Sequence, residues 1–301
     1  MRDPFNRPPL AVTDGIPVFT APSPYISNYD LIASVHLESL RVSGRSPFMT
    51  DSQIDESLAA TLDLARPLVA DGSCVLDAGV GCGQLLAREP RLERHGVDIS
   101  IEYLRIAQSR GYSVAMAELS DLPHASGAFD AVFACDVLEH LIDIDKSVAE
   151  LRRVLRPGGV LVVRVPNEEC LDQYLDPTAF EFAHVRTFSE SSLRLYLEKC
   201  HGFRWIERRF CAAGFYTASQ LRHPAPGSKS GCREAIERER AIAMDPSAQR
   251  ALDCLLSAAS WSLQEQVDAL ITLRDGSPET FARLADMLVR PAGLVAALRR
   301  T

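Results

Sequence analysis

Residues 75–83 read Val-Leu-Asp-Ala-Gly-Val-Gly-Cys-Gly, and this stretch decides how the chain folds. The apolar run ahead of Gly79 predicts a buried strand, and the three glycines predict a sharp turn out of it. Such a loop lets a ligand approach the backbone closely and presents N–H groups to it. Gln84 stands where a dinucleotide-binding fingerprint would place its third glycine. The pattern therefore favours a nucleoside ligand without a pyrophosphate over NAD.

Apolar runs alternate with helical patterns on both sides of this loop. Further strands are predicted at 96–99, 112–117, 129–135, 160–165 and 203–211, with another near 215–218. Helices are predicted at 26–42, 51–68, 101–110, 145–155 and 189–199. Strands that alternate with helices predict a mostly parallel sheet covered on both faces. We therefore expect a doubly wound, Rossmann-like α/β fold with a sheet of about seven strands.

The positions of proline, glycine and apolar residues predict three regions in the chain. Residues 1–55 are expected to form an N-terminal arm and helical lid, since six prolines lie among the first 25 residues. Residues 56–221 are expected to form the core. Residues 222–301 begin with a Pro/Gly-rich linker and continue with helices at 234–244, 247–273 and 278–289, predicting a C-terminal helical extension. Its apolar stripe predicts support of the core, dimerisation or an acceptor lid.

Composition limits the function classes. The chain has 301 residues, a net charge of −8 and eight cysteines. That charge argues against a large nonspecific nucleic-acid surface. No two cysteines form a C-x-x-C pair, and no run of 18 apolar residues is present, so neither a zinc ribbon nor a membrane span is expected. The first residues lack the apolar stretch of a signal peptide, and we expect a cytoplasmic protein without membrane or nucleic-acid partners.

Several blocks, taken in order, carry a family resemblance. After the glycine loop come Gly-Val-Asp-Ile at 96–99, Glu-Leu-Ser-Asp-Leu-Pro at 118–123, the block 129–140, and Leu-Arg-Pro-Gly-Gly at 155–159. Together they resemble the class I S-adenosylmethionine-dependent methyltransferases, in particular the type 11 and ubiquinone-biosynthesis-like small-molecule enzymes. The resemblance implies S-adenosylmethionine as cofactor, bound by Asp77, Gly79, Gly81, Gly83, Asp98, Ile99, Glu118, Leu119 and Asp136. Glu118 departs from the aspartate that the family commonly has there.

Two histidines are candidates for catalysis. His140 follows the fourth predicted strand and His184 lies in a later segment, and imidazole titrates close to neutral pH. Either could act as a general base for the acceptor, or pack over the cofactor. Asp136-x-x-Glu139-His140 also resembles the metal-binding acid-x-x-Glu-His motif of ubiquinone-pathway O-methyltransferases. Because an aspartate replaces the usual first glutamate, we expect no metal and activity that survives chelation.

The expected function is methyl transfer to a hydroxyl, amine or carbon of a small molecule. A protein or RNA methyltransferase is an alternative, and so is a regulatory protein that binds S-adenosylmethionine without catalysis. The acidic balance and the lack of a basic aromatic patch count against RNA.

Overall fold

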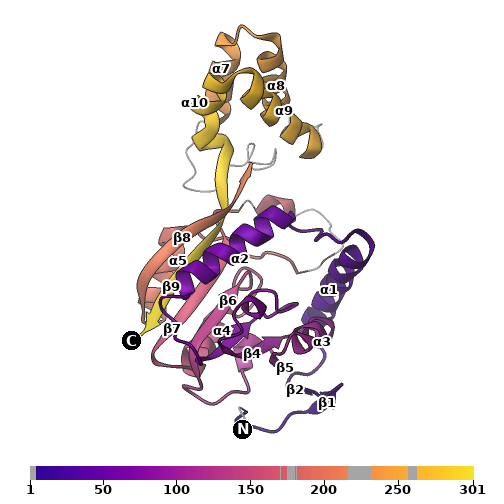
Figure 1. Cartoon of the computed structure of the whole chain (residues 1–301), viewed down its shortest axis with the longest axis vertical. Helices are drawn as coiled ribbons and strands as arrows, with labels where there is room; N and C mark the ends of the chain where they lie inside the picture. The colour runs from indigo at the N-terminus through magenta and orange to yellow at the C-terminus, as the bar shows by residue number, and fades with distance from the viewer. Residues whose placement is uncertain (1–4, 170, 175–179, 181, 216–231, 257–262) are drawn as a thin grey trace. The chain divides into compact units, whose positions relative to one another are not determined.

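The computed structural model describes residues 5–169, 171–174, 180, 182–215, 232–256 and 263–301 (Figure 1). The chain divides into two compact units. The first comprises Met1–Asn167, Thr178–Ala212 and Gly293–Thr301, and it holds the α/β core. The second comprises Glu168–Pro177 and Ala213–Ala292, and its described part is mainly helical. Among the described residues, no helix has the length and apolar character needed to cross a membrane.

One sheet organises the first unit, with its strands in the order β1-β2-β5-β4-β3-β6-β7-β9-β8. From β2 to β7 each neighbouring pair is parallel, whereas β1 runs antiparallel to β2 and β9 antiparallel to β7. The strands are β1 (Ala11–Thr13), β2 (Ile16–Val18), β3 (Cys74–Ala78), β4 (Glu93–Asp98), β5 (Ser113–Met116), β6 (Phe129–Cys135), β7 (Leu155–Pro166), β8 (Phe203–Phe215) and β9 (Val289–Arg300).

Helices cover both faces of this sheet. They are α1 (Pro24–Ser43), α2 (Asp51–Ala65), α3 (Ile101–Ser109), α4 (Ile144–Val154) and α5 (Glu190–Leu195), with short turns η1 (Leu86–Arg88), η2 (Leu119–Asp121), η3 (Leu171–Tyr174) and η4 (Tyr196–Cys200). Alternate residues of β3 serve opposite faces. Leu76 packs in the cluster that contains α4, and Val75 in the cluster that contains α2 and α3. Figure 1 shows α2 crossing the front of the sheet.

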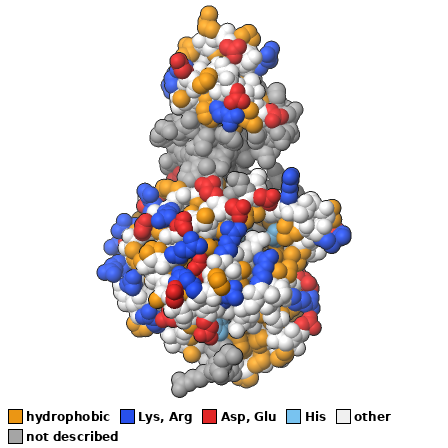
Figure 2. Space-filling model, viewed as in Figure 1, with side chains coloured by type: hydrophobic (Ala, Val, Ile, Leu, Met, Phe, Trp, Pro, Cys, Tyr) orange, Lys and Arg blue, Asp and Glu red, His pale blue; other side chains and the backbone are white. Residues whose placement is uncertain are grey.

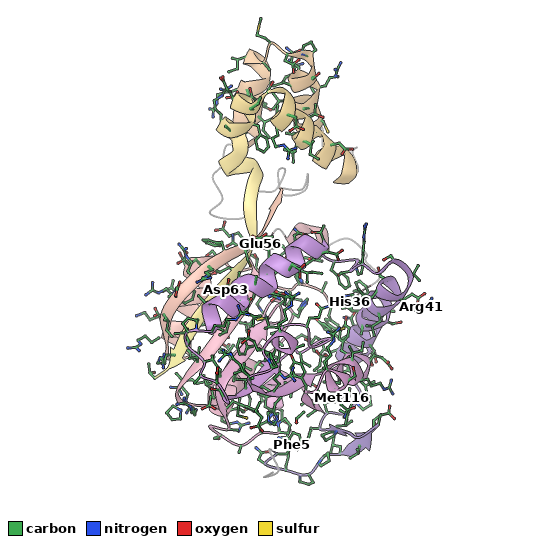
Figure 3. All side chains as sticks on the ribbon, in the orientation of Figure 1. Phe5, His36, Arg41, Glu56, Asp63 and Met116 are labelled. Atoms are coloured by element: carbon green, nitrogen blue, oxygen red, sulfur yellow. The ribbon has the colours of Figure 1, made fainter. Side chains whose placement is uncertain are left out.

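Local sequence signals fix the helix that becomes important at the site. Ser23 accepts a hydrogen bond from the backbone N–H of Ile26 at 3.2 Å, so it caps the N-terminus of α1. Gly44 ends α1 in a left-handed conformation with φ +72°. On the side of α1 that meets α3, His36 (labelled in Figure 3) has its Nδ1 2.8 Å from the hydroxyl of Tyr103. The caps define the ends of α1, and the His36–Tyr103 contact joins it to α3.

The expected doubly wound α/β fold is confirmed, and the number of strands is corrected. The sheet has nine strands among the described residues rather than about seven. Two of the additional strands come from the proline-rich arm, which forms a β1–β2 hairpin through Asp14 and Gly15, both at positive φ. An Asp-Gly pair between extended residues is a strong hairpin signal that the analysis of the arm did not use.

The end of the chain also differs from expectation. Residues 222–301 do not form a C-terminal extension, because β9 returns to the core sheet and pairs with β7 from Val160↔Arg299 to Pro166↔Gly293. The helices are therefore an insertion between β8 and β9. The strand expected near 215–218 lies largely outside the described residues. The apolar run Leu294–Leu298 was the missed signal, since all five of its residues are 0% exposed.

The second unit has a core of its own. It contains α7 (Cys232–Ile242), α8 (Pro246–Leu256), α9 (Leu263–Gly276) and α10 (Pro278–Leu288). The apolar stripe noted in the sequence lies on α8 and α9 rather than on one helix, and Leu252, Leu255, Leu270 and Leu273 are buried together. Ion pairs Arg240–Asp253 and Arg283–Glu239 join neighbouring helices. The stripe thus contributes to the core of this unit.

The position of β9 predicts opposite outcomes for two deletions. Truncation after Gly227 removes β9, and each large apolar side chain that loses its burial costs about 1.5–3 kcal/mol, against a total stability of about 5–15 kcal/mol. We expect that protein to be insoluble or unfolded. Replacing residues 214–291 by a short Gly/Ser linker should leave a folded core, because a Cβ on Gly293 would lie 2.8 Å from Cys211 Sγ, which places the two strand ends side by side.

Circular dichroism and thermal unfolding of the two proteins, with the full chain as control, would test this. A truncated protein that unfolds cooperatively at the temperature of the full chain would contradict the structural role of β9.

Candidate functional site

The candidate site lies where the parallel strands end. Gly79, Gly81 and Gly83 follow β3, and all three have positive φ, at +77°, +50° and +68°. A Cβ on Gly79 would lie 2.9 Å from Val137 and one on Gly83 would lie 2.9 Å from Tyr112, whereas one on Gly81 would meet nothing within 4 Å. The first and third glycines are therefore required by packing. Gly81 instead faces open space, where a ligand can approach the backbone.

Asp98 stands beside this open space at the end of β4. Its Oδ2 accepts the N–H of Gly81 at 2.9 Å and its Oδ1 accepts the N–H of Ser100 at 3.0 Å. Burial raises the pKa of the Asp98 carboxyl, and the backbone donors oppose that rise. Each carboxylate oxygen has a second lone pair, so the carboxylate can still accept two hydroxyl donors. Ile99 lies next to it in the turn before α3.

Glu118 and Leu119 follow β5, the next strand in the sheet. Glu118 precedes η2, and its Oε1 accepts a hydrogen bond from the hydroxyl of Thr20 at 3.0 Å. The backbone N–H of Phe19 donates to the carbonyl of Met116 at 2.8 Å, so the N-terminal arm is tied to the end of β5 (Figure 3 labels Met116). The structure thus brings Glu118 to the same sheet edge as Asp98. Leu119 is buried in the core.

Asp77 occupies a different environment from the other predicted cofactor residues. It lies within β3, is only 3% exposed, and its Oδ2 lies 3.5 Å from the hydroxyl of Tyr112. Burial raises the pKa of its carboxyl to about 8, although the positive charge of nearby Arg164 acts to lower that pKa. Asp77 therefore lies beneath the glycine loop, in contact with the side chain that packs under Gly83.

Asp136 is held by an arginine that the sequence analysis overlooked. Arg164 of β7 donates from Nη2 to Asp136 Oδ2 at 2.6 Å and from Nε to both carboxylate oxygens at 3.0 Å. Its Nη1 donates to Thr61 of α2 at 3.1 Å. Asp136 also adopts φ +51°, which is uncommon outside glycine. This ion pair, in which Arg164 is buried and Asp136 is partly exposed, fixes the direction in which the chain leaves β6.

The loop after β6 carries Glu139 and His140, and a distant segment brings His184 beside them. The rings of His140 and His184 have centroids 4.6 Å apart. His140 Nε2 lies 4.0 Å from Glu139 Oε1, and the Glu139 side chain is 1% exposed. The backbone N–H of Val185 donates to the carbonyl of Glu139 at 3.0 Å. Both predicted catalytic histidines therefore share one site with a buried carboxyl group.

Helix α1 packs against this histidine site. The Tyr29 ring lies 5.7 Å from the His140 ring, and the Tyr25 hydroxyl donates to the carbonyl of His140 at 3.3 Å. Asn28 exchanges two hydrogen bonds with the backbone of Phe182, at 2.7 and 3.2 Å. Burial raises the pKa of Tyr25 to about 12, with nearby Glu118 and Asp98 contributing. Tyr25 therefore contacts His140, and the carboxylates of the glycine-loop site influence the pKa of its hydroxyl.

Sequence reasoning missed Tyr25, Tyr29 and Arg164. A signal existed for Arg164, since it is the one charge in the strand Val-Leu-Val-Val-Arg-Val at 160–165, and a buried charge needs a partner. The tyrosines carried no comparable signal, because an aromatic side chain on an amphipathic helix is as typical of a core as of a site.

The glycine loop predicts a contrast between two alanine variants. Gly81→Ala introduces a Cβ into the open space beside Asp98, so it should weaken cofactor binding at least tenfold. Its free energy of unfolding should fall by only roughly 1–2 kcal/mol, because alanine is strained in the left-handed conformation. Gly83→Ala should also force a clash with Tyr112 and lower the melting temperature further. Calorimetry with S-adenosylmethionine and thermal unfolding would separate the two effects. Normal cofactor binding by Gly81→Ala would place the ligand elsewhere.

The buried carboxyl predicts a pH dependence of stability. Because the pKa of Asp77 is raised from 3.8 to about 8, the folded protein keeps a proton that the unfolded chain releases. The group's contribution to stability is therefore present at low pH and is lost as the pH rises toward 8. Asp77→Asn cannot ionise, so its stability relative to the natural protein should increase between about pH 5 and pH 8 in urea unfolding. A difference that stays constant with pH would contradict the raised pKa.

Comparison with known proteins supports the family resemblance. Residues 76–163 match the family described as "Methyltransferase domain". A tRNA (carboxymethyluridine(34)-5-O)-methyltransferase of Arabidopsis thaliana is 36% identical over 97 residues, which are 31% of this chain and 24% of that protein. A ubiquinone biosynthesis O-methyltransferase of Mesorhizobium japonicum is 36% identical over 113 residues, 34% of this chain and 44% of that protein. The match thus spans less than half the length of these relatives.

A solved structure extends the likeness of fold beyond the matched segment. It is a SAM-dependent methyltransferase from Thermotoga maritima, described as a possible histamine N-methyltransferase. It aligns with a TM-score of 0.51 and 15% identity, covering 92% of this chain and 100% of that one. At this identity the comparison shows the fold alone. Taken with the glycine loop and the acids at the strand ends, these matches show that residues 76–163 within the α/β core form a methyltransferase domain, similar to those of S-adenosylmethionine-dependent enzymes.

Proposed function

We propose that this protein transfers a methyl group from S-adenosylmethionine to a nucleophilic atom of a small molecule. The observation that carries the proposal is the joint position of Gly81, Asp98 and Glu118 at the ends of neighbouring parallel strands. Open space beside Gly81 suits a ligand that runs along the loop, and the Asp98 carboxylate suits a ribose with two hydroxyl donors. Glu118 offers a further acceptor for an adenine amino group.

The residues of the chain then have separate tasks. When bound, the cofactor supplies a methyl group that its sulfonium has already activated for in-line displacement. The glycine loop and Asp98 hold the nucleoside end in place, and orientation of this kind can contribute about 7–11 kcal/mol to lowering a barrier. Asp136 holds the start of the next loop through Arg164, so we assign it a positioning role rather than a direct contact.

His140 and His184 are the residues that we assign to the acceptor. They lie beyond the Asp136 turn, and a neutral imidazole can accept the proton that a hydroxyl or ammonium acceptor must lose. The hydrogen bond from Tyr25 and the packing of Tyr29 place α1 against the same histidine. These contacts from α1 cover one side of His140.

Charge distribution favours a small acceptor over RNA. Three arginines near β8 are paired with acids, in Arg208–Glu190, Arg194–Glu198 and Arg209–Glu207. On the face drawn in Figure 2, basic side chains are interspersed with acidic ones. An RNA-binding surface needs an uncompensated basic stripe, usually with exposed aromatic side chains for stacking. Together with the net charge of −8, this supports a small-molecule acceptor.

A calorimetric comparison tests the cofactor half of the proposal. Asp98→Asn keeps the size of the side chain but removes one acceptor and the charge, so S-adenosylmethionine binding should weaken by about 1–3 kcal/mol, roughly 5- to 150-fold in Kd. Glu102→Gln is the matched control, because Glu102 is an exposed carboxylate on α3. Its affinity should not change. Tight binding of NAD with no binding of S-adenosylmethionine would overturn the assignment.

The acceptor half needs a separate measurement. The protein would be incubated with isotopically methyl-labelled S-adenosylmethionine and three pools: low-molecular-weight metabolites, total RNA and total protein. We expect label in the metabolite pool, and its loss with His140→Ala together with His184→Ala. Label confined to the RNA or protein pool would reject a small-molecule acceptor. Cofactor binding without label in any pool would reject catalysis in favour of a regulatory role.

A further inference from the structure

Three metal-ligating side chains gather at the edge of the sheet opposite the glycine loop. Cys74 begins β3, and Glu93 and His95 lie at the start of β4. One ligand atom of each residue lies within 4.8 Å of the ligand atoms of the other two. Thiolate, carboxylate and imidazole are all ligands of Zn²⁺, and none of the three residues has a role in the proposed function.

Strand pairing places the three side chains on one face of the sheet. Cys74 is the register partner of Glu93 in the parallel β3–β4 pair, and His95 follows two residues after Glu93. Register partners, and residues two apart on one strand, point to the same side of a sheet. Leu76 and Val97 pack on that side, and Cys74 packs against their cluster. The arrangement therefore follows from backbone pairing between two strands and needs no rearranged loop.

We propose that Cys74, Glu93 and His95 bind one Zn²⁺ ion that joins the start of β3 to the start of β4. The distance from His95 Nε2 to Glu93 Oε1 is 3.4 Å, which exceeds the roughly 2.7–3.2 Å of an ordinary N–H···O hydrogen bond. Zinc bonds of about 2.0–2.2 Å at tetrahedral angles separate a nitrogen and an oxygen ligand by about 3.4 Å. These two atoms thus already have the spacing that the ion requires. The thiolate is the third ligand, and a water molecule is the fourth.

The surroundings combine rigid support with access for an ion. The His95 side chain is 8% exposed, and its ring centroid lies 5.4 Å from that of Phe129, so packing fixes its position. The backbone N–H of Cys74 donates to Asp130 Oδ2 at 2.9 Å, which fixes the start of β3. The Glu93 side chain is 60% exposed, so an ion can reach the site from solvent.

The charges around the thiol are compatible with a bound cation. Burial raises the pKa of the Cys74 thiol to about 11, and the negative charges of Glu93 and Asp130 add to that rise. Asp130 is itself paired with Arg156 at 2.6 Å, so Glu93 is the negative charge that an incoming ion meets. When the ion binds, the zinc–sulfur bond replaces the sulfur–hydrogen bond and the proton passes to solvent.

The two joined strands carry cofactor residues at their other ends. β3 leads into the glycine loop, and β4 ends at Asp98. Cys74 and Ala78 bound a strand of five residues, which separates the ion from the loop by about 13 Å at about 3.3 Å per residue. An ion that binds the folded chain and not the unfolded one stabilises the folded state. We therefore assign the ion a structural role, as a link between two strands and not as a participant in methyl transfer.

Cobalt spectroscopy detects this site directly. The full-length protein is treated with EDTA, dialysed and titrated with Co²⁺. A thiolate ligand gives Co²⁺ an intense near-ultraviolet charge-transfer band, which a site made only of carboxylates and imidazoles lacks. We expect the band to saturate at one ion per chain and to be lost in Cys74→Ser, and we expect Co²⁺ to bind at least tenfold more weakly in Glu93→Gln and His95→Gln.

A second cysteine provides the matched control. Cys200 is exposed and lies outside the group, so Cys200→Ser should keep the band at full intensity. Normal binding of S-adenosylmethionine by every variant shows that it is folded. Absence of the band from the natural protein, or its persistence in Cys74→Ser, would overturn the proposal.

Thermal unfolding tests the structural role. Excess Zn²⁺ should raise the melting temperature of the natural protein and of Cys200→Ser by several degrees, and should leave that of Cys74→Ser unchanged. An equal rise in Cys74→Ser would mean that the ion acts elsewhere, which refutes the link between β3 and β4. The Kd of the natural protein for S-adenosylmethionine should be the same with and without Zn²⁺, and a changed Kd would contradict the separation of the two sites.

Discussion

Parallel pairing of the strands from β3 to β7 is the constraint on which the rest of the site depends. The carboxyl ends of neighbouring parallel strands all lie at one edge of the sheet. Residues far apart in sequence therefore meet there as a result of ordinary strand pairing. Gly79 follows β3, Asp98 ends β4 and Asp136 follows β6. Register, rather than local sequence, therefore determines that an acid stands beside the glycine loop.

At this edge of the sheet, the Arg164–Asp136 pair places a buried arginine beside the site. Placing an arginine inside a strand flanked by valines carries a desolvation cost that only close, multiple hydrogen bonds offset. Arg164 donates such hydrogen bonds to Asp136 and Thr61. The backbone N–H of Asp136 also donates to the carbonyl of Arg164 at 2.8 Å, which holds Asp136 in its left-handed conformation. Two apolar side chains in place of Arg164 and Asp136 would avoid the desolvation cost, but they would not fix the direction of the loop that leads to Glu139 and His140.

The sequence was sufficient for the elements whose signals are local. The strand and glycine turn at 75–83, the helix from Ile101 and the buried strand at 129–135 all formed as predicted, because periodicity and turn residues act over a few positions. It was insufficient for long-range pairing. Nothing local in the C-terminal run from Leu294 indicates that it belongs beside β7, and nothing in the motif around His140 indicates that His184 lies against it. Asp77 shows the remaining difficulty, since a motif residue can be buried as structural support.

The order of the last strands explains how this core carries a helical unit without losing its sheet. Strands β8 and β9 are neighbours, and Cys211 and Gly293 meet where the chain leaves and re-enters the core. The entropy of closing a loop grows only slowly with its length, so once two strand ends are held together, a long insertion between them costs little more than a short one. The insertion can bury its own apolar face and fold as a unit. The inserted unit can therefore vary while the strand ends that hold the glycine loop and its acids stay as they are.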